Sequence, residues 1–272
     1  MWARGLRSRN VKPFWIATIV LLLAPVGCSL MAQRAGGQPH WSQTRWASAG
    51  LLPDPATDPE ALVQVWAART WGWKGAFAVH SWIVLKEEGA AEYERYEVVG
   101  WGVRRGLPAV RRNLRPADGY WAGNAPELLG EKRGAEAAAA IAKIRAAIAA
   151  YPWADRYLTW PGPNSNSFVA YVLRAVPDLG IELPPTAIGK DFVGASLVAP
   201  MPSGTGYQLS LAGLLGVGIA AREGFELNIL GLVLGVDPGD LAIKLPGLGR
   251  LGLHSANGSA PAASLDGPAP GA

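Results

Sequence analysis

Two residue types that cooperate in nucleophilic catalysis stand at separate points of the chain. Ser165 lies in the stretch WPGPNSNSF, residues 160–168, directly before the apolar run VAYVL, where a helix is expected to begin. His80 is the one histidine expected inside the folded part, because His40 falls in a linker and His254 near the C-terminus. A helix N-terminus favours developing negative charge, so a serine there can attack a carbonyl group when a histidine takes its proton.

The same residues also have a purely structural interpretation. Asn and Ser before an apolar run are common helix N-caps, which contribute about 1 kcal/mol, and spacing alone favours Ser165 as such a cap. Asn164, Asn166 and Ser167 then either complete the cap or contact a substrate. His80, in the middle of an expected strand, can equally be a buried histidine that is satisfied by one hydrogen bond.

A histidine base needs a polar neighbour that orients its ring. Glu97 is the first candidate, because it lies on the strand expected to pair with the strand of His80. A glutamate on a strand is otherwise typical of a solvent-facing position. The other candidates are Tyr96 or Tyr93, if the strand register differs by one, and then Asp155 and Asp191.

The elements that position these residues can be predicted from periodicity. AFAVHSWIVLK alternates, with Phe77, Val79, Ser81, Ile83 and Leu85 on one side and His80 and Trp82 on the other. With the turn EEGAAE and the return strand YERYEVVGW, it predicts an antiparallel hairpin over residues 76–101. GAEAAAAIAKIRAAIAAY predicts a helix that ends at Pro152, and a second helix is expected from about Ser167 to Ala175, before Pro177. The stretch DPEALVQVWAARTW predicts a short helix or an extended arm.

The C-terminal third is rich in glycine and predicts strands instead of helices. Two long strands are expected, from SGTGYQLSLAGLLGVGIA and from GFELNILGLVLGVD, joined at AREG. Alternation places one set of residues on a common face: Tyr207, Leu209, Leu211, Leu215, Val217 and Ile219. This pair of strands either packs on the main core or contacts a membrane or partner.

These elements predict an α+β fold, an antiparallel sheet with packed helices and a C-terminal Gly-rich β-hairpin extension. The expected organisation is a signal peptide or membrane anchor at 1–32, a linker at 33–55, the α+β core domain at 56–200, the hairpin extension of the same domain at 201–253, and a disordered tail at 254–272.

The N-terminus is typical of export. Four basic residues precede an uncharged run from Pro13 to Gln33, so the segment is either a secretory signal peptide or a single membrane anchor, and Pro25 favours the signal peptide. The body is then expected in the periplasm or anchored in the bacterial envelope. Cys28 follows APVG, which resembles a lipoprotein box and implies lipidation, although Pro25 departs from that pattern. Lipidation, cleavage and an intact anchor stay open.

Composition excludes several other functions. Without the four N-terminal basic residues, the chain has 21 basic and 21 acidic residues, and it shows no stripe of basic residues that could bind nucleic acid. No metal-ligand spacing and no phosphate-loop pattern occur, so neither a metal nor a nucleotide cofactor is implied. Five tryptophans either line a groove for sugar or acyl chains or belong to the core: Trp71, Trp73, Trp82, Trp101 and Trp160.

Long segments of the body resemble a known bacterial family. VQVWAARTWGWKGAFAVHSWIVLK, YERYEVVGWG, NAPELLGEKRG, YPWADRYLTWPGPNSNSF, LPPTAIGKDF and PSGTGYQLSLAGLLG are similar to the domain of unknown function 3750, over about residues 52–252. Its name implies no activity. NSNSFV also resembles the Asn-Cys-x-x-Phe-Val stretch of permuted papain-like proteins, such as lecithin retinol acyltransferase and NlpC-type cell-wall endopeptidases. That resemblance implies a permuted papain-like core in which a strand histidine precedes the nucleophile, the order of His80 and Ser165.

The papain-like resemblance departs at the nucleophile, where Ser165 replaces the cysteine of that family. A serine hydroxyl needs a base that acts in the transition state, whereas a thiol ionises readily beside a histidine. Two functions follow. The first is an envelope hydrolase or acyltransferase that acts with Ser165 and His80 on peptidoglycan peptide or lipid acyl groups. The second is a non-catalytic envelope protein that binds a membrane or partner through residues 207–236. The sequence does not determine the oligomeric state.

Overall fold

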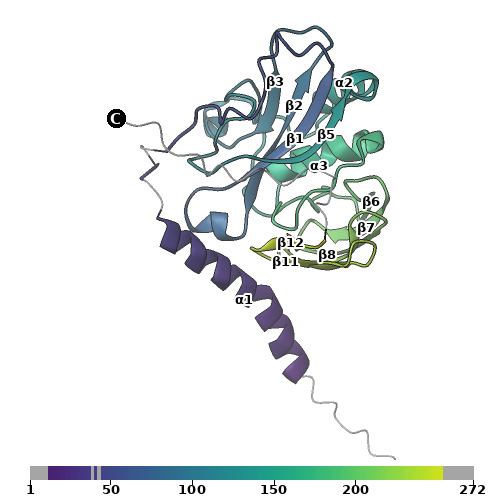
Figure 1. Ribbon diagram of the computed structural model, residues 1–272. Coiled ribbons are helices and arrows are strands. Elements are labelled where there is room, and N and C mark those ends of the chain that lie inside the picture. Colours follow the sequence, from purple (N-terminus) through teal and green to yellow (C-terminus); the bar gives the residue numbers. More distant parts are fainter. Residues whose placement is uncertain (1–11, 38–39, 42–43, 254–272) are drawn as a thin grey trace, which may run out of the picture.

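The computed structural model describes residues 12–37, 40–41 and 44–253 (Figure 1). The expected tail at 254–272 and the basic residues before Lys12 lie outside this range. The helices are α1 (Lys12–Gly36), α2 (Gly134–Ala149) and α3 (Ser165–Ala175), with short 3₁₀ turns η2 (Gly72–Ala76), η3 (Val103–Arg105) and η4 (Pro177–Leu179). The strands are β1 (Leu62–Arg69), β2 (Val79–Lys86), β3 (Glu94–Val98), β4 (Val110–Arg112), β5 (Glu127–Arg133), β6 (Val198–Pro200), β7 (Gly206–Leu211), β8 (Leu215–Ala220), β9 (Gly224–Ile229), β10 (Leu232–Asp237), β11 (Ala242–Leu245) and β12 (Gly249–Leu251).

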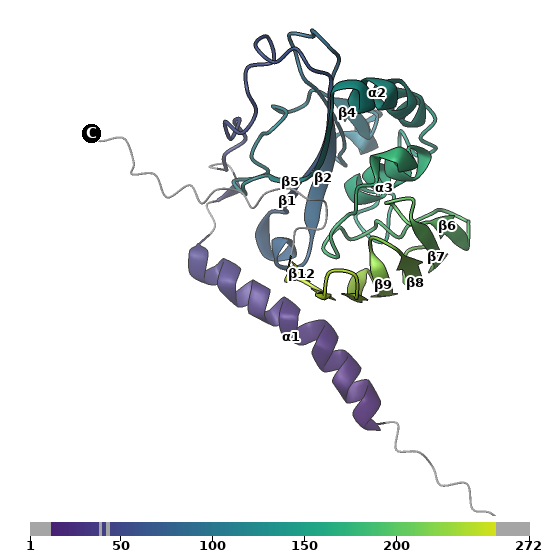
Figure 2. The ribbon, with the colours of Figure 1, turned by 45° about the vertical axis from the view of Figure 1, so that its right-hand side comes forward.

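The strands form two antiparallel sheets, which confirms the α+β class. The first sheet has the order β4-β3-β2-β1-β5, and the second has the order β12-β11-β10-β9-β8-β7-β6. In Figure 2 the helices α2 and α3 lie on one side of the first sheet, and the second sheet lies beyond α3. The permuted papain-like arrangement stays a prediction.

The first sheet is apolar on both faces. One face packs with α2 and α3 into the main core, which includes Val65, Ile83 and Phe168. The other face carries a smaller cluster around Trp66, Trp82 and Trp121. Because β1 is covered on both faces, all but its last residue are buried and its sequence does not alternate. The prediction of a short helix around residues 58–71 is therefore wrong, and the alternative prediction of an extended segment is correct.

The hairpin and the two body helices follow the sequence closely. β2 and β3 pair antiparallel within the expected hairpin, with Ile83 opposite Tyr96. α2 ends at Ala149, before Pro152, and α3 ends at Ala175, before Pro177. The expected linker at 33–55 contacts the body, because Ser48 bridges to Gly119 and the backbone N–H of Leu51 donates to Asp118.

The C-terminal segment has more strands than expected. Each of the two long strands is a hairpin, because turns at Ala212 and Leu230 reverse the chain with positive φ values of 51° and 55°. The face predicted from alternation is confirmed, since Tyr207 pairs with Ile219, Leu209 with Val217 and Leu211 with Leu215. Neither apolar core cluster contains a described residue of the second sheet.

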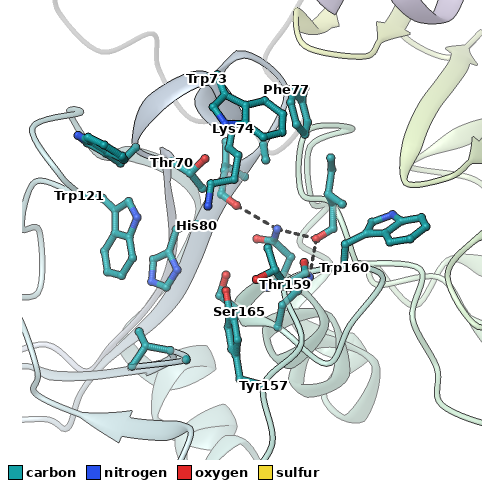
Figure 3. Close-up of a pocket in the computed structure, with 18 of the residues that line it drawn as sticks. Thr70, Trp73, Lys74, Phe77, His80, Trp121, Tyr157, Thr159, Trp160 and Ser165 are labelled. Atoms are coloured by element: carbon teal, nitrogen blue, oxygen red, sulfur yellow. Dashed lines mark hydrogen bonds between the residues drawn. The ribbon is translucent and has the colours of Figure 1, made fainter. Parts of the chain in front are cut away.

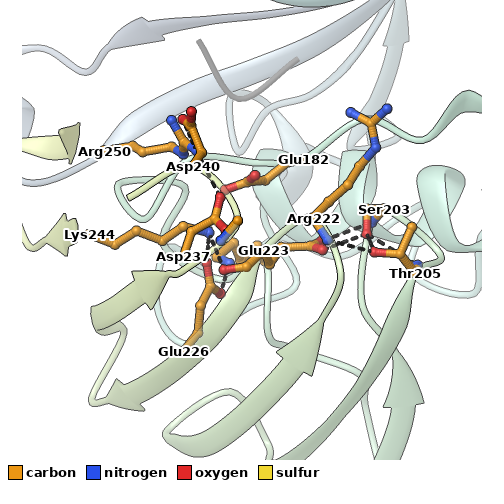
Figure 4. Close-up of polar contacts among 12 residues, drawn as sticks. Glu182, Ser203, Thr205, Arg222, Glu223, Glu226, Asp237, Asp240, Lys244 and Arg250 are labelled. Carbon is orange, nitrogen blue, oxygen red and sulfur yellow. Dashed lines mark hydrogen bonds and ion pairs between the residues drawn. The ribbon is translucent and has the colours of Figure 1, made fainter. Parts of the chain in front are cut away.

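Buried charges hold the second sheet to the body (Figure 4). Lys244 Nζ donates to Glu226 at 2.7 Å and to Glu182 at 2.5 Å, and Lys190 pairs with the other oxygen of Glu226. Burial would raise the pKa of Glu226, but the charges of Lys190 and Lys244 outweigh it and lower the pKa. The inner face of this sheet is therefore polar and ionised.

The helix α1 runs unbroken through Pro25, and its N-terminal end extends away from the body (Figure 1). Trp15–Gly36 is long and apolar enough to cross a membrane, with a mean hydropathy of 2.1. Its C-terminal part packs against η2, β10 and β11. This helix is compatible with either membrane anchoring or an export signal.

Candidate functional site

A cavity of about 810 Å³ lies at the end of the first sheet, between that sheet, the start of α3 and the second sheet (Figure 3). Its walls come from α1, the segment after β1, η2, β2, the loop after β3, the loop before α3 and the β9–β10 turn. Its lining includes Leu23, Val26, Thr70, Trp71, Trp73, Lys74, His80, Trp101, Trp121, Trp160, Ser165 and Leu230. His80 and Ser165 thus line the same cavity.

The cap of α3 is Asn164, one residue before the expected position. Asn164 Oδ1 accepts from the backbone N–H groups of Asn166 and Ser167, each at 3.0 Å, and Ser167 Oγ accepts from the backbone N–H of Asn164. Ser165 is therefore the first helical residue. The interpretation of Ser165 as the cap is wrong, because the side chain of Asn164 already accepts from the backbone N–H groups of Asn166 and Ser167.

The other polar residues of this loop also have structural partners. Asn166 Oδ1 accepts from Ser81 Oγ at 2.8 Å, and its Nδ2 donates to the carbonyl groups of Val79 and Ile188. These bonds join α3 to β2 across the main core. Asn166 and Ser167 thus fix the position of Ser165 within the fold.

The hydroxyl and the backbone N–H of Ser165 are left without hydrogen bonds within the described part of the chain. Neither its hydroxyl nor its backbone N–H makes a hydrogen bond to any of the residues that the structure describes. Its side chain is nearly buried and lines the cavity. An unbonded hydroxyl and an unbonded N–H at the N-terminus of a helix are the groups that a serine nucleophile uses for attack and for oxyanion stabilisation.

His80 is held rigidly on the opposite face of the first sheet. Its ring stacks on Trp121, with centroids 3.4 Å apart and planes at 7°, and its Nε2 lies 2.7 Å from Glu97 Oε2. Glu97 is near because the register places it opposite Trp82, the next residue on the same face as His80. The structure thus brings Glu97 to His80.

Arg95 completes this buried group. Its Nη2 donates to Glu97 Oε2 at 3.0 Å, its Nε lies 2.9 Å from Oε1, and its guanidinium covers the ring of Trp82. Burial would raise the pKa of Glu97, but the hydrogen bond from His80 and the charge of Arg95 lower it, so the carboxylate is ionised.

Burial also sets the protonation of His80. It lowers the pKa of His80 below 6.5 and outweighs the opposing effect of the hydrogen bond to Glu97. The ring is therefore neutral near pH 7. Because an ionised carboxylate only accepts hydrogen bonds, Nε2 carries the proton and Nδ1 has a free lone pair, which is the state of a general base.

No hydrogen bond joins His80 to Ser165 among the described residues. Ser81 points to α3, so its neighbour His80 points to the other face of β2, and the two candidate residues reach the cavity from different sides. Direct proton transfer needs a separation of roughly 3 Å, or one bridging water. The pair is thus placed in one cavity without being in contact.

The remaining candidates for the third residue lie elsewhere. Tyr96 donates to Glu94 and Tyr93 to the carbonyl of Pro53. Asp155 is exposed, and Asp191 accepts from Asn228 beneath the second sheet. None of these four residues lines the cavity.

The tryptophans divide between wall and core. Trp71, Trp73, Trp101 and Trp160 line the cavity and are partly exposed, whereas Trp82 is fully buried. The groove interpretation therefore describes four of the five, and the core interpretation describes Trp82. Trp160 Nε1 donates to the carbonyl of Leu230, which ties the cavity wall to the second sheet.

Two further polar residues of the cavity were not anticipated from the sequence. Thr70 Oγ1 is buried and has no hydrogen-bond partner among the described residues. Lys74, on η2, extends its amine toward the side of the cavity that holds His80 and Thr70 (Figure 3). Both belong to TWGWKG, a linking segment with no catalytic motif. Only the closure of the fold brings them to His80.

The site residues also lie within the part of the chain that matches a known family. Residues 60–192 match a family described as protein of unknown function (DUF3750). This part of the chain belongs to that family. The match includes His80, Glu97 and Ser165 and is narrower than the range of about 52–252 expected from the sequence. No curated protein and no solved structure matches the chain.

Among the described residues, no group of three or more His, Cys, Asp or Glu side chains is arranged to hold a metal ion. Cys28 is a free, exposed cysteine on α1. Its position does not test lipidation, which stays a prediction.

Proposed function

We propose that this protein is an exported, membrane-anchored enzyme that hydrolyses or transfers an acyl ester or amide, with Ser165 as its nucleophile. The observation that carries this proposal is the unbonded hydroxyl of Ser165 in a cavity that also holds a neutral, oriented histidine. The cap at Asn164 supports it, because the fold satisfies the helix end without using Ser165.

The proposed reaction uses His80 twice. In the first step, Ser165 Oγ attacks the carbonyl carbon of the substrate while its proton passes to Nδ1 of His80, directly or through one water. Collapse of the tetrahedral intermediate breaks the bond to the leaving group, which takes the proton from His80. Water, or an acceptor alcohol or amine, then attacks the acyl-enzyme while His80 takes its proton. The bond between Ser165 Oγ and the acyl group breaks, the acyl product leaves, and Ser165 Oγ takes the proton back from His80.

The neighbouring groups have supporting roles in this proposal. Glu97 holds Nε2 and stabilises the imidazolium that forms in each step. Because the N–H groups of Asn166 and Ser167 are occupied by Asn164, the backbone N–H of Ser165 is the helix donor left for the oxyanion. Lys74 lies on the same side of the cavity as His80, where it would favour a substrate with an anionic group.

The walls of the cavity favour a lipid acyl group as the substrate. Tryptophans and aliphatic side chains form most of the wall, and Leu23 and Val26 of the apolar helix α1 contribute to it. A peptidoglycan peptide would need more hydrogen-bonding partners than this wall offers.

The contribution of α1 to the wall also favours an uncleaved anchor. Cleavage before Cys28 would remove Leu23 and Val26 from the cavity. We therefore expect the mature protein to keep its N-terminal helix, with the body in the periplasm. Intact mass measurement of the protein purified from membranes tests this; loss of residues before Cys28, with added lipid mass, would contradict it.

The missing contact between His80 and Ser165 favours a second candidate. In that case the protein is a non-catalytic envelope protein whose cavity binds an apolar ligand, and the hydroxyl of Ser165 contributes only polarity. Both candidates predict binding of acyl chains, but only the first predicts turnover.

Hydrolysis of p-nitrophenyl esters separates the two candidates. The full chain in detergent is assayed with butyryl and lauroyl esters, beside Ser165→Ala and a control, Ser196→Ala, at an exposed serine outside the cavity. The catalytic proposal expects turnover that Ser165→Ala abolishes and Ser196→Ala retains. Binding of the lauroyl ester without turnover in the unmodified chain would establish the second candidate instead.

A further inference from the structure

The outward side of the second sheet is apolar on every strand. One row of paired residues crosses β7 to β12: Tyr207, Ile219, Phe225, Val236, Ile243 and Leu251. Each of these side chains is more than 40% exposed, with Tyr207 at 69% and Ile219 at 64%. No charged residue occupies an outward position on the strands β6 to β12. This surface is called the outer face below.

The inward side of the same sheet has the opposite character. Gln208, Glu226, Asn228 and Lys244 all point inward and are buried, with hydrogen bonds to other parts of the body. An antiparallel sheet with one solvated face normally places its apolar residues inward and its polar residues outward. Contiguous exposed apolar surface on this scale is rare in soluble monomers and marks a contact with a membrane or another protein.

The position of α1 indicates which of these contacts applies. α1 packs against β10 and β11, and a Cβ atom at Gly247, in the β11–β12 turn, would lie only 3.1 Å from Val26 Cα. From this contact the helix extends away from the body with exposed apolar residues, among them Ile16 and Ile19. A bilayer that receives this part of α1 therefore also meets the neighbouring edge of the second sheet.

We propose that the outer face lies on the lipid bilayer, against the leaflet from which α1 emerges to join the body. The helix spans the membrane while the sheet rests in the interfacial and upper acyl region, as monotopic proteins do. This proposal goes beyond catalysis, because it holds whether or not Ser165 reacts. It also places the cavity wall formed by Leu23, Val26 and Leu230 next to the lipid.

The test measures how close each surface is to lipid acyl chains. The full chain carries Cys28→Ala and one new cysteine for a bimane label, either Ile219→Cys or Phe225→Cys on the outer face. The control is Ala142→Cys, an exposed position on α2, which lies on the side of the body away from α1 (Figure 1). Each protein is placed in vesicles of phosphatidylethanolamine and phosphatidylglycerol, with and without doxyl-labelled lipid.

We expect doxyl lipid to quench bimane at positions 219 and 225 several-fold more strongly than at position 142. Equal, weak quenching at all three positions would overturn the proposal. Weak quenching together with efficient bis-maleimide cross-linking of Ile219→Cys to itself would overturn it in favour of a second copy of this chain on the outer face.

Discussion

The first sheet buries the ion pair between Arg95 and Glu97 on β3, next to a histidine that lines the cavity, whereas the second sheet buries ionised side chains across its inner face. In the first sheet the surrounding core is apolar, and the pair is connected to a histidine that faces the cavity. In the second sheet the ions contact one another and the body. Buried charge thus orients a titratable group in one region and joins two layers in the other.

The two regions also differ in what covers them. The first sheet has both faces covered by its own chain, so its apolar residues complete a core. The second sheet turns its apolar residues outward, away from its own ionised inner face. Apolar residues on a strand therefore mark buried core in the first sheet and exposed surface in the second.

The largest effect on stability is expected from Glu226→Gln. The substitution removes the carboxylate shared by Lys190 and Lys244, and an uncompensated buried charge costs roughly 3–5 kcal/mol. Urea unfolding of the full chain in detergent measures the change. The control Glu136→Gln, at an exposed ion pair with Lys132, is expected to stay within about 0.5 kcal/mol of the unmodified chain. A loss below about 1 kcal/mol for Glu226→Gln would contradict the bonding role of the network.

Glu97→Gln is expected to lower both stability and ester turnover. It leaves Arg95 without its counter-charge and removes the carboxylate that fixes the His80 ring, so kcat should fall by roughly 10²- to 10⁴-fold. Assays are made at a temperature where the variant is folded by circular dichroism. Glu226→Gln is the matched control, since it lowers stability while leaving the kcat of folded protein unchanged. Equal kcat values for both variants would remove Glu97 from the mechanism.

A smaller effect separates Asn164 from Ser165. Asn164→Ala removes the acceptor for two backbone amides and should cost about 1–2 kcal/mol. Ser165→Ala removes a hydroxyl without a hydrogen bond and should change the free energy of unfolding by less than about 0.5 kcal/mol. Thermal unfolding of both variants measures the difference. A larger loss for Ser165→Ala than for Asn164→Ala would show that Ser165 has a structural role.

The gentlest change is a titration. Because the pKa of His80 is lowered in the folded protein, the neutral ring is favoured by the fold. The associated stability is fully present above pH 6.5 and is lost as the pH falls through the lower folded-state pKa. The rate of ester turnover should fall over the same acidic range, because only neutral His80 accepts a proton. A pH–rate profile whose acid limb lies above 6.5 would contradict this assignment.

How much of this could be predicted from sequence depends on the kind of signal. The hairpin of β2 and β3 was predictable because its residues alternate and a polar turn separates its strands. β1 gave no alternation, since both of its faces are covered. The β7–β8 and β9–β10 turns were missed because Ala212 and Leu230 are themselves apolar and continue the apolar runs, although both adopt left-handed backbone conformations.

The site was predictable only in part for related reasons. Ser165, His80 and Glu97 were found from residue type and strand pairing, which are local signals. Thr70 and Lys74 reach the cavity through the packing of η2, which no local pattern encodes. Alternation also identified which residues share the outer face, but it does not reveal which side of a sheet the chain itself covers. The inversion of the second sheet therefore required the structure.

The central claim is that Ser165 is a nucleophile activated within this cavity. Incubation of the full chain with a fluorophosphonate, followed by peptide mass spectrometry, tests it most directly, because this probe bonds only to an activated serine. The account predicts one phosphonate adduct, on the peptide that contains Ser165, and slower formation of that adduct in His80→Ala. An unmodified Ser165 in folded protein, or an adduct that forms at the same rate without His80, would contradict the account.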